Sequence, residues 1–122
     1  AFDWVSRETA FVDAYVNDQR CGFQASNAYW RDMFRFLNTL YSRQSLEQFR
    51  PDIPVYLFSG DQDPVGHNGK GVEKLAAWLK AHLTNVTVQL YPQARHDVLH
   101  EINQSKVIAD LIGWLTAQQR EV

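Results

Sequence analysis

Two residues late in the chain, Asp63 and His96, have the types and positions that acid–base chemistry requires. Asp63 lies in Ser-Gly-Asp-Gln-Asp-Pro-Val (residues 59–65), after a short apolar run, and His96 lies in Ala-Arg-His-Asp (residues 94–97), after a second run. An acid and a histidine in these places are two of the three members of a Ser-His-Asp triad, which hydrolyses acyl compounds through a nucleophilic serine. The nucleophile motif Gly-x-Ser-x-Gly occurs nowhere in the 122 residues.

The Asp63–His96 pair, called the dyad below, competes with simpler interpretations of each residue. Asp63 alone fits a turn residue and His96 alone fits a solvated loop histidine. Their joint position after successive strands favours the dyad, in which the acid accepts a hydrogen bond from His Nδ1–H and fixes the tautomer. Pro64 disfavours helical backbone at Asp63 and so helps to set the direction of its carboxylate. We expect Asp61, the competing acid, to cap the loop instead.

Other reactive residue types give weaker signals. His96 and His100 have the i, i+4 spacing of a zinc helix, but Asp97 stands where that motif needs glutamate, so we predict no metal and no cofactor. His100 is expected to pack or hydrogen-bond beside the dyad. Residues 67–71 are read as a glycine-lined helix start rather than a phosphate loop. Cys21 is expected to be a buried or half-buried thiol. The serines that lack a nucleophile elbow are Ser6, Ser26, Ser42, Ser45, Ser59 and Ser105.

The elements that carry the dyad predict a parallel sheet. Residues 55–58 form a continuous apolar run, typical of a strand buried on both faces, and residues 86–91 alternate as a strand nearer a sheet edge does. Residues 70–82 and 105–117 have helical apolar spacing. The residues that we expect the last helix to bury are Val107, Ile108, Leu111, Ile112 and Leu115. This order predicts a right-handed βαβ unit with both strand ends at one edge.

Residues 4–41 have a helical pattern, interrupted by a loop at residues 17–23. Ser26 and Asn27 are candidate N-caps of the second helix, and a shorter segment at residues 45–49 precedes the strand. The expected apolar stripes are Phe11, Val12, Tyr15 and Val16 in the first helix, and Tyr29, Met33, Phe36, Leu37 and Leu40 in the second. Trp30 and Phe34 fall off the second stripe, so that helix needs partners on more than one side.

Composition limits the class of protein. The chain has 122 residues, 45% of them hydrophobic and 13% aromatic, which suffices for one domain with a packed core. The formal net charge is −2 without charge blocks, so no nucleic-acid partner is expected. No run approaches the roughly 20 apolar residues of a membrane helix, and no signal-peptide layout is present. With Cys21 as the single cysteine, these features favour a cytoplasmic protein.

Three stretches resemble a known family: residues 54–66, residues 90–101 and residues 112–115. They are similar to the C-terminal part of α/β hydrolases of the monoacylglycerol lipase and lysophospholipase-like group (serine aminopeptidase S33). Residues 2–7 and 18–23 look like the end of the cap over the active site in bacterial members. The resemblance implies a helical cap segment at residues 1–45 and the C-terminal portion of the hydrolase core at residues 46–122.

The resemblance also implies roles. Asp63 falls on the triad acid and His96 on the triad base, residues 4–41 would cover an acyl pocket, and the substrates would be carboxylic esters of lipid-like alcohols. The nucleophile, the oxyanion hole and the first half of the sheet would come from an N-terminal half in the same or another chain. A start without methionine fits a cut within a longer polypeptide. By itself, the chain is expected to be inert.

Two alternatives remain open at this point. Two strands do not make a stable sheet, so the chain could be a non-catalytic fragment that forms a homodimer through its open sheet edge. A zinc hydrolase built on His96 and His100 would instead require bound metal.

Overall fold

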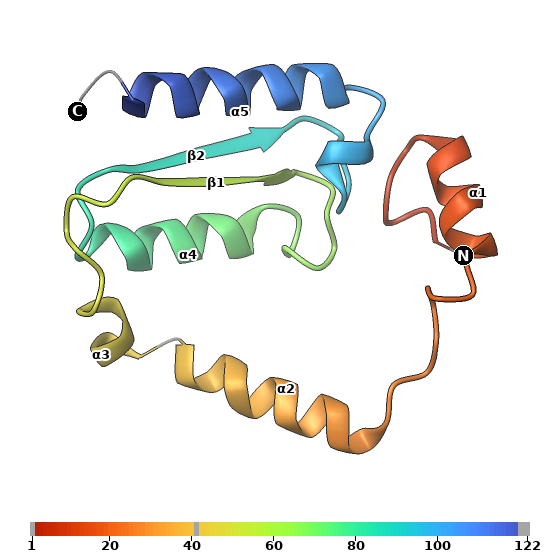
Figure 1. Ribbon diagram of the computed structural model, residues 1–122, viewed down its shortest axis with the longest axis horizontal. Helices are drawn as coiled ribbons and strands as arrows, with labels where there is room; N and C mark the ends of the chain where they lie inside the picture. The colour runs from red at the N-terminus through yellow and green to blue at the C-terminus, as the bar shows by residue number, and fades with distance from the viewer. Residues whose placement is uncertain (1, 41, 120–122) are drawn as a thin grey trace.

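The computed structural model describes residues 2–40 and 42–119. Its centre is a two-stranded sheet of β1 (Val55–Gly60) and β2 (Val86–Tyr91), which pair in parallel. The register runs from Val55 opposite Val86 to Gly60 opposite Tyr91. Both strands therefore end at the same edge of the sheet, where the two arrowheads lie side by side in Figure 1. The predicted parallel pairing is confirmed, and β1 is two residues longer than expected.

One helix covers each face of this sheet. Helix α4 (Lys70–Lys80) lies on one face and α5 (Gln104–Gln119) on the other, which gives three layers (Figure 1). On the α4 side, the buried cluster consists of Leu46, Leu79 and Leu83. On the α5 side, it consists of Tyr91, Ala94, Val98 and Val107, with Phe58 packed against it. Alternation along β1 sends Val55 and Leu57 toward the first cluster and Phe58 toward the second.

The expectation that β1 is buried on both faces is wrong for most of its length. Residues 55–58 are only half-buried, while Ser59 and Gly60 at the strand end are buried. The reason is the width of the sheet: within the described residues β1 has one neighbouring strand, so its other edge and part of each face stay open.

The burial predicted for the last helix is correct for one of its two apolar stripes only. Val107 is fully buried, and Leu111 and Trp114 are half-buried toward the sheet. The exposed stripe is Ile108, Ile112 and Leu115. A sheet of two strands offers one surface to α5, so the second stripe has nothing to pack on among residues 2–40 and 42–119.

The N-terminal part of the chain holds three helices: α1 (Thr9–Asn17), α2 (Asn27–Leu40) and α3 (Arg43–Leu46). Residues 4–8 form the end of a turn and irregular backbone rather than the expected helix, and α3 begins earlier than predicted. Ser26 caps α2 as predicted, since its hydroxyl accepts a hydrogen bond from Tyr29 N–H at 3.2 Å.

Helix α2 buries none of its residues, although its sequence predicts an apolar stripe facing a core. Its exposed large apolar residues are Tyr29, Trp30, Phe34, Phe36, Leu37 and Leu40. In α1 the predicted stripe is half-buried except for Val16, which is exposed. None of the helices in the described ranges combines the length and the apolar character that crossing a membrane requires.

Candidate active site

Asp63 and His96 meet at the edge where both strands end. His96 Nδ1 lies 3.1 Å from Asp63 Oδ2, within hydrogen-bond distance, although the residues are 33 positions apart. Asp63 follows β1 and His96 follows β2, so parallel pairing brings their loops together. With Asp63 as a carboxylate, Nδ1 carries a proton and donates a hydrogen bond to Oδ2. This fixes the tautomer in which Nε2 is free to accept a proton.

The Asp63 carboxylate is buried and held from both sides. Its Oδ1 accepts a hydrogen bond from Val65 N–H at 2.9 Å, which leaves Oδ2 for His96. A Cβ atom on Gly66 would lie 3.2 Å from Oδ2, so only glycine fits there without pressure on the carboxylate. Asp61 does what the sequence predicts: its Oδ1 accepts a hydrogen bond from Gln93 N–H at 2.6 Å and so ties the two loops together.

Close backbone approach at Gly60 is what allows the two loops to meet. A Cβ atom at this position would lie 2.0 Å from the carbonyl oxygen of Ala94 and 2.3 Å from that of Arg95. These are backbone atoms that precede His96, and no side chain can rotate away to relieve the contact. Glycine at the end of β1 is therefore a geometric condition for the dyad.

His96 is half-exposed, with 44% of its side chain accessible, and it faces a cavity of about 350 Å³. The Trp4 ring packs against the imidazole, with 5.2 Å between ring centroids and 50° between ring planes. Nε2 has no hydrogen-bond partner among the residues that the structure describes. The cavity is lined by Trp4, Val5, Tyr15, His96 and Asp97. The proton-accepting nitrogen thus adjoins a partly apolar space that can receive an organic substrate.

The leading segment, residues 3–7, is bonded to the loop that carries His96. The backbone N–H groups of His96 and Asp97 donate to the carbonyl oxygens of Trp4 and Val5, at 3.3 and 2.8 Å. The Arg95 guanidinium donates to the carbonyl oxygens of Asp3 and Ser6. These bonds set the position of the Trp4 ring relative to His96.

Glu101, five residues after His96, has a fully buried carboxylate. Burial alone raises the pKa of the Glu101 carboxyl. Hydrogen bonds from Arg95 N–H, from the Arg7 guanidinium, and from the N–H groups of Arg7 and Ile102 lower that pKa by more, so it lies below its ordinary value. Glu101 is therefore held as an anion inside the protein.

The remaining sequence candidates do not join the dyad. His100, in the short helix η1 (Val98–His100), stacks on Phe11 at 4.3 Å and its Nδ1 contacts Asp97 Oδ2 at 3.0 Å. Within the described ranges no group of three or more His, Cys, Asp or Glu side chains could hold a metal ion. Cys21 is half-buried, as predicted.

The two buried serines make local hydrogen bonds. Ser6 Oγ donates to the carbonyl oxygen of His100 at 2.7 Å and accepts from Glu8 N–H at 2.9 Å. Ser59 Oγ donates to the carbonyl oxygen of Gly60 at 3.4 Å. Neither of these hydroxyls contacts the His96 imidazole.

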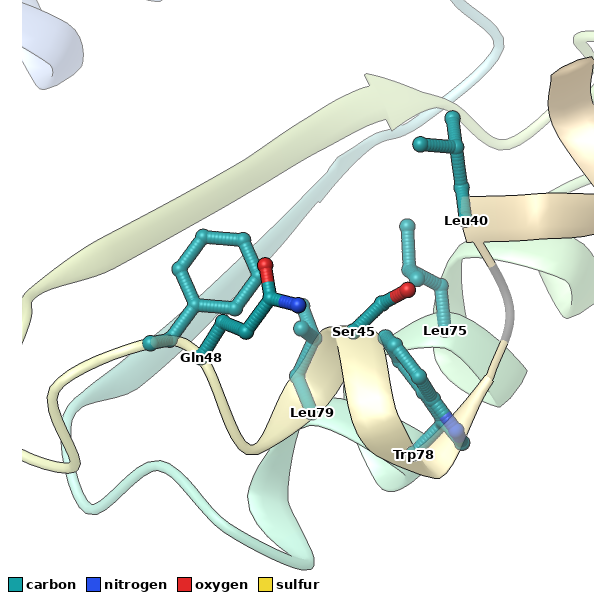
Figure 2. A pocket seen from close by; sticks show the side chains of 7 residues that line it. Leu40, Ser45, Gln48, Leu75, Trp78 and Leu79 are labelled. Atoms are coloured by element: carbon teal, nitrogen blue, oxygen red, sulfur yellow. The ribbon is translucent and has the colours of Figure 1, made fainter.

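A larger cavity of about 570 Å³ lies away from the dyad, where the end of α2 and the α3 region face α4 (Figure 2). Its lining is Leu40, Ser45, Gln48, Phe49, Leu75, Trp78 and Leu79. Among residues 2–40 and 42–119 no ionisable side chain lines it, and Ser45 Oγ already bonds to Ser42 and to the carbonyl oxygen of Thr39. The smaller cavity beside His96 has acid–base groups in its lining and is therefore the candidate active site.

The sequence does not indicate the roles of two residues of the site, Gly60 and Glu101. Trp4 falls in the stretch expected over the pocket, but in a turn rather than a helix, and Glu101 lies in a run that gives no local sign of burial. Gly60 was read only as the end of a strand. The sequence offers one signal for this contact: Gly60 stands between a strand and an acidic loop, a position typical of close backbone approach.

Comparisons with known proteins identify the family and the fold of the chain. A hydrolase family model described as serine aminopeptidase, S33, matches residues 1–103. No curated protein matches the chain. Among solved structures, the chain is similar to a highly thermostable carboxyl esterase from Bacillus coagulans, solved in complex with glycerol, with a TM-score of 0.78 and 28% sequence identity. The similarity covers 94% of this chain and 38% of the esterase chain, so the chain spans less than half the length of that enzyme.

Proposed function

Because the chain belongs to the serine aminopeptidase S33 family of hydrolases, we propose that it supplies the acid and the base of a serine hydrolase that cleaves carboxylic esters. The family and the fold class predicted from the sequence, the C-terminal part of an α/β hydrolase, are confirmed. The observation that carries the proposal is the dyad itself: a buried carboxylate 3.1 Å from His96 Nδ1, with Nε2 beside a cavity.

In this proposal His96 Nε2 takes the proton of a serine hydroxyl as its oxygen attacks the ester carbonyl carbon. His96 then gives that proton to the departing alcohol, which leaves an acyl-serine. A water molecule then loses a proton to His96 as its oxygen attacks the acyl carbon; the bond from that carbon to the serine oxygen breaks, the acid leaves, and His96 returns the proton to the serine oxygen. Asp63 accepts a hydrogen bond from Nδ1–H throughout and stabilises the imidazolium. The serine and the oxyanion hole come from the part of the hydrolase that corresponds to the remainder of the esterase.

Substrate class and domain roles extend the same proposal. Residues 1–45 act as the cap and residues 46–122 as part of the core. Support comes from the Trp4 and Tyr15 side chains that line the cavity beside His96, since aromatic walls suit the apolar part of a lipid-like ester. The proposed substrates are lysophospholipid-like or monoacylglycerol-like esters.

A fluorophosphonate, which labels only an activated serine, tests the proposal. We expect the full-length protein, or a chain that co-purifies with it, to gain the mass of the label. Asp63→Asn should slow labelling and ester hydrolysis by about 10³- to 10⁴-fold, because the imidazole loses the partner that sets its tautomer.

His82→Gln is the matched control, since His82 Nε2 contacts the carbonyl oxygen of Phe49 far from the dyad. It should leave the labelling rate unchanged. A full-length protein that takes up no label, or an Asp63→Asn variant that reacts at the rate of the parent protein, would contradict the proposed function.

The open edge of β1 favours a second candidate, a non-catalytic chain that pairs with a copy of itself. Light scattering during gel filtration distinguishes the two. A dimer without fluorophosphonate reactivity is expected from this second candidate, and a labelled species is expected from the first.

A further inference from the structure

Glu101 is a buried anion that the proposed reaction does not use. None of its surface is exposed, and both of its carboxylate oxygens accept hydrogen bonds. Oε1 accepts from Arg95 N–H at 2.9 Å and from Arg7 N–H at 3.1 Å. Oε2 accepts from Arg7 Nε–H at 2.9 Å and from Ile102 N–H at 3.2 Å. Four donors thus converge on one side chain.

These donors belong to three separate segments. Arg95 immediately precedes His96, Arg7 ends the leading segment that carries Trp4, and Ile102 precedes α5. The leading segment is also bonded directly to the His96 loop, since His96 N–H donates to the Trp4 carbonyl oxygen. Glu101 therefore lies where the backbone that precedes His96 meets the backbone that follows Trp4.

We propose that Glu101 is a positioning residue, which holds the His96 loop and the leading segment together so that the imidazole stays aligned with Asp63. This inference rests on the proposed function for its effect on rate, but not for its effect on the His96–Asp63 contact. It assigns Glu101 no contact with substrate and no proton transfer. The same anchor keeps the Trp4 ring against the imidazole, at 5.2 Å between centroids.

Carboxylate chemistry is needed at this position because all four partners are donors. A glutamine has one acceptor oxygen, and its NH₂ group would face N–H groups instead of accepting from them. In a buried place those donors would lose their partners, and the segments would separate to let in water. Glu101→Gln is therefore a nearly isosteric change that removes the anchor and keeps the volume.

The test is carried out on the full-length protein with ¹⁵N-labelled histidine. In the parent protein, the His96 Nδ1 proton that is donated to Asp63 should give a deshielded, slowly exchanging NMR signal. In Glu101→Gln this signal should be lost or broadened. With a small soluble ester, kcat should fall about 10- to 100-fold while KM changes little, because misalignment of the base affects the reacting atoms more than substrate binding.

Two controls separate positioning from general stability. Leu83→Ala leaves a cavity in the cluster on the α4 side and should lower the melting temperature without changing the His96 signal or kcat. Glu47→Gln removes an exposed carboxylate that pairs with Arg43 and should change neither property. Arg7→Lys is a milder second variant that keeps the charge and loses the Nε–H bond. It should weaken the His96 signal less than Glu101→Gln does. If Glu101→Gln does not fold, the result with Arg7→Lys alone tests whether the anchor keeps His96 aligned with Asp63.

An unchanged His96 signal and an unchanged kcat in the variants would overturn the inference, even if they melted at lower temperature. Failure of the proposed function gives a different result. In that case the parent protein hydrolyses no ester, yet it still shows the His96 signal, and Glu101→Gln still loses it.

Discussion

The end of the molecule that holds the site buries polar side chains, whereas helix α2 exposes apolar ones. The site end, defined as residues 3–7, 59–69 and 91–103, buries the polar residues Ser6, Asp63 and Glu101. Each of them makes hydrogen bonds to other parts of the site end. Helix α2 instead exposes large apolar side chains, with Trp30 45% and Phe34 57% accessible.

This contrast shows which geometry the described chain specifies by itself. A buried polar group with all its partners fixes distances and directions, because each lost bond is costly in an apolar environment. The aromatic residues of α2 contact one another, as Trp30 and Phe34 do by stacking, and such contacts within one helix do not fix its position relative to the sheet. The dyad is thus specified within residues 2–119, whereas what α2 packs against is not.

The largest expected effect comes from breaking the site end at Gly60. Gly60→Ala would place a Cβ atom 2.0 Å from the carbonyl oxygen of Ala94, so β1 and the His96 loop must separate. We expect a loss of more than about 4 kcal/mol in the free energy of unfolding. Denaturant titration followed by tryptophan fluorescence measures it.

Gly113→Ala is the matched control, because nothing lies within 4 Å of the added Cβ atom in the middle of α5. It should stabilise the protein by about 0.5 to 1 kcal/mol, since alanine favours helix more than glycine does. Equal effects of the two substitutions would show that the site end is not closely packed at Gly60.

A smaller effect on the free energy of unfolding is expected when the pH is lowered, because Glu101 then becomes protonated. Because its folded-state pKa lies below the ordinary value, Glu101 contributes stability that is fully present above about pH 4.3, and this is lost as the pH falls through the folded-state value. Glu101→Gln should cost about 3 kcal/mol at pH 7, since it leaves Arg7 without its buried partner. The difference between the parent protein and the variant should shrink in acid.

Urea unfolding of both proteins at pH 7 and at pH 3 measures this prediction. Asp110→Asn is a useful comparison, because Asp110 lies on the partly exposed side of α5, away from the dyad. A hydrogen bond from Lys106, and to a smaller extent one from Tyr91, lowers the pKa of Asp110. A stability difference for Glu101→Gln that is the same at both pH values would contradict the buried-anion account.

The smallest effect is expected in α2. Replacing Trp30 and Phe34 by serine should change the free energy of unfolding by less than about 0.5 kcal/mol per site, as for other exposed positions. Leu83→Ala, in the core on the α4 side, should cost about 2 to 5 kcal/mol under the same conditions. A loss of that size at Trp30 or Phe34 would show that α2 is covered by a part of the protein outside the described residues.

The strands and the dyad were predictable from the sequence because their signals are local. An apolar run bounded by Pro54 and Gly60 predicts β1, and residues directly after parallel strands must meet at one edge. The contact between Asp63 and His96 follows from those two facts. The structure adds that Asp63 is buried and that its second oxygen is already occupied by Val65 N–H.

The remainder could not be predicted because it depends on partners far apart in the chain. Arg7 and Glu101 are 94 positions apart, and nothing beside either residue indicates the pairing. Apolar periodicity predicts that α5 can bury two stripes, but not that the described sheet covers only one of them. The pattern correctly places Ile112 on an apolar stripe of α5. It wrongly predicts that this stripe is buried, since Ile112 is exposed.

The two helices α1 and α2 are tied to the rest of the molecule at both ends. Before them, Arg7 is anchored to Glu101, and after them Leu46 is packed with Leu79 and Leu83. A stretch fastened in this way can be lengthened, shortened or exchanged between residues 9 and 40 without moving either fastening. Residues 9–40 can therefore differ in length and sequence while Asp63 and His96 keep their 3.1 Å contact.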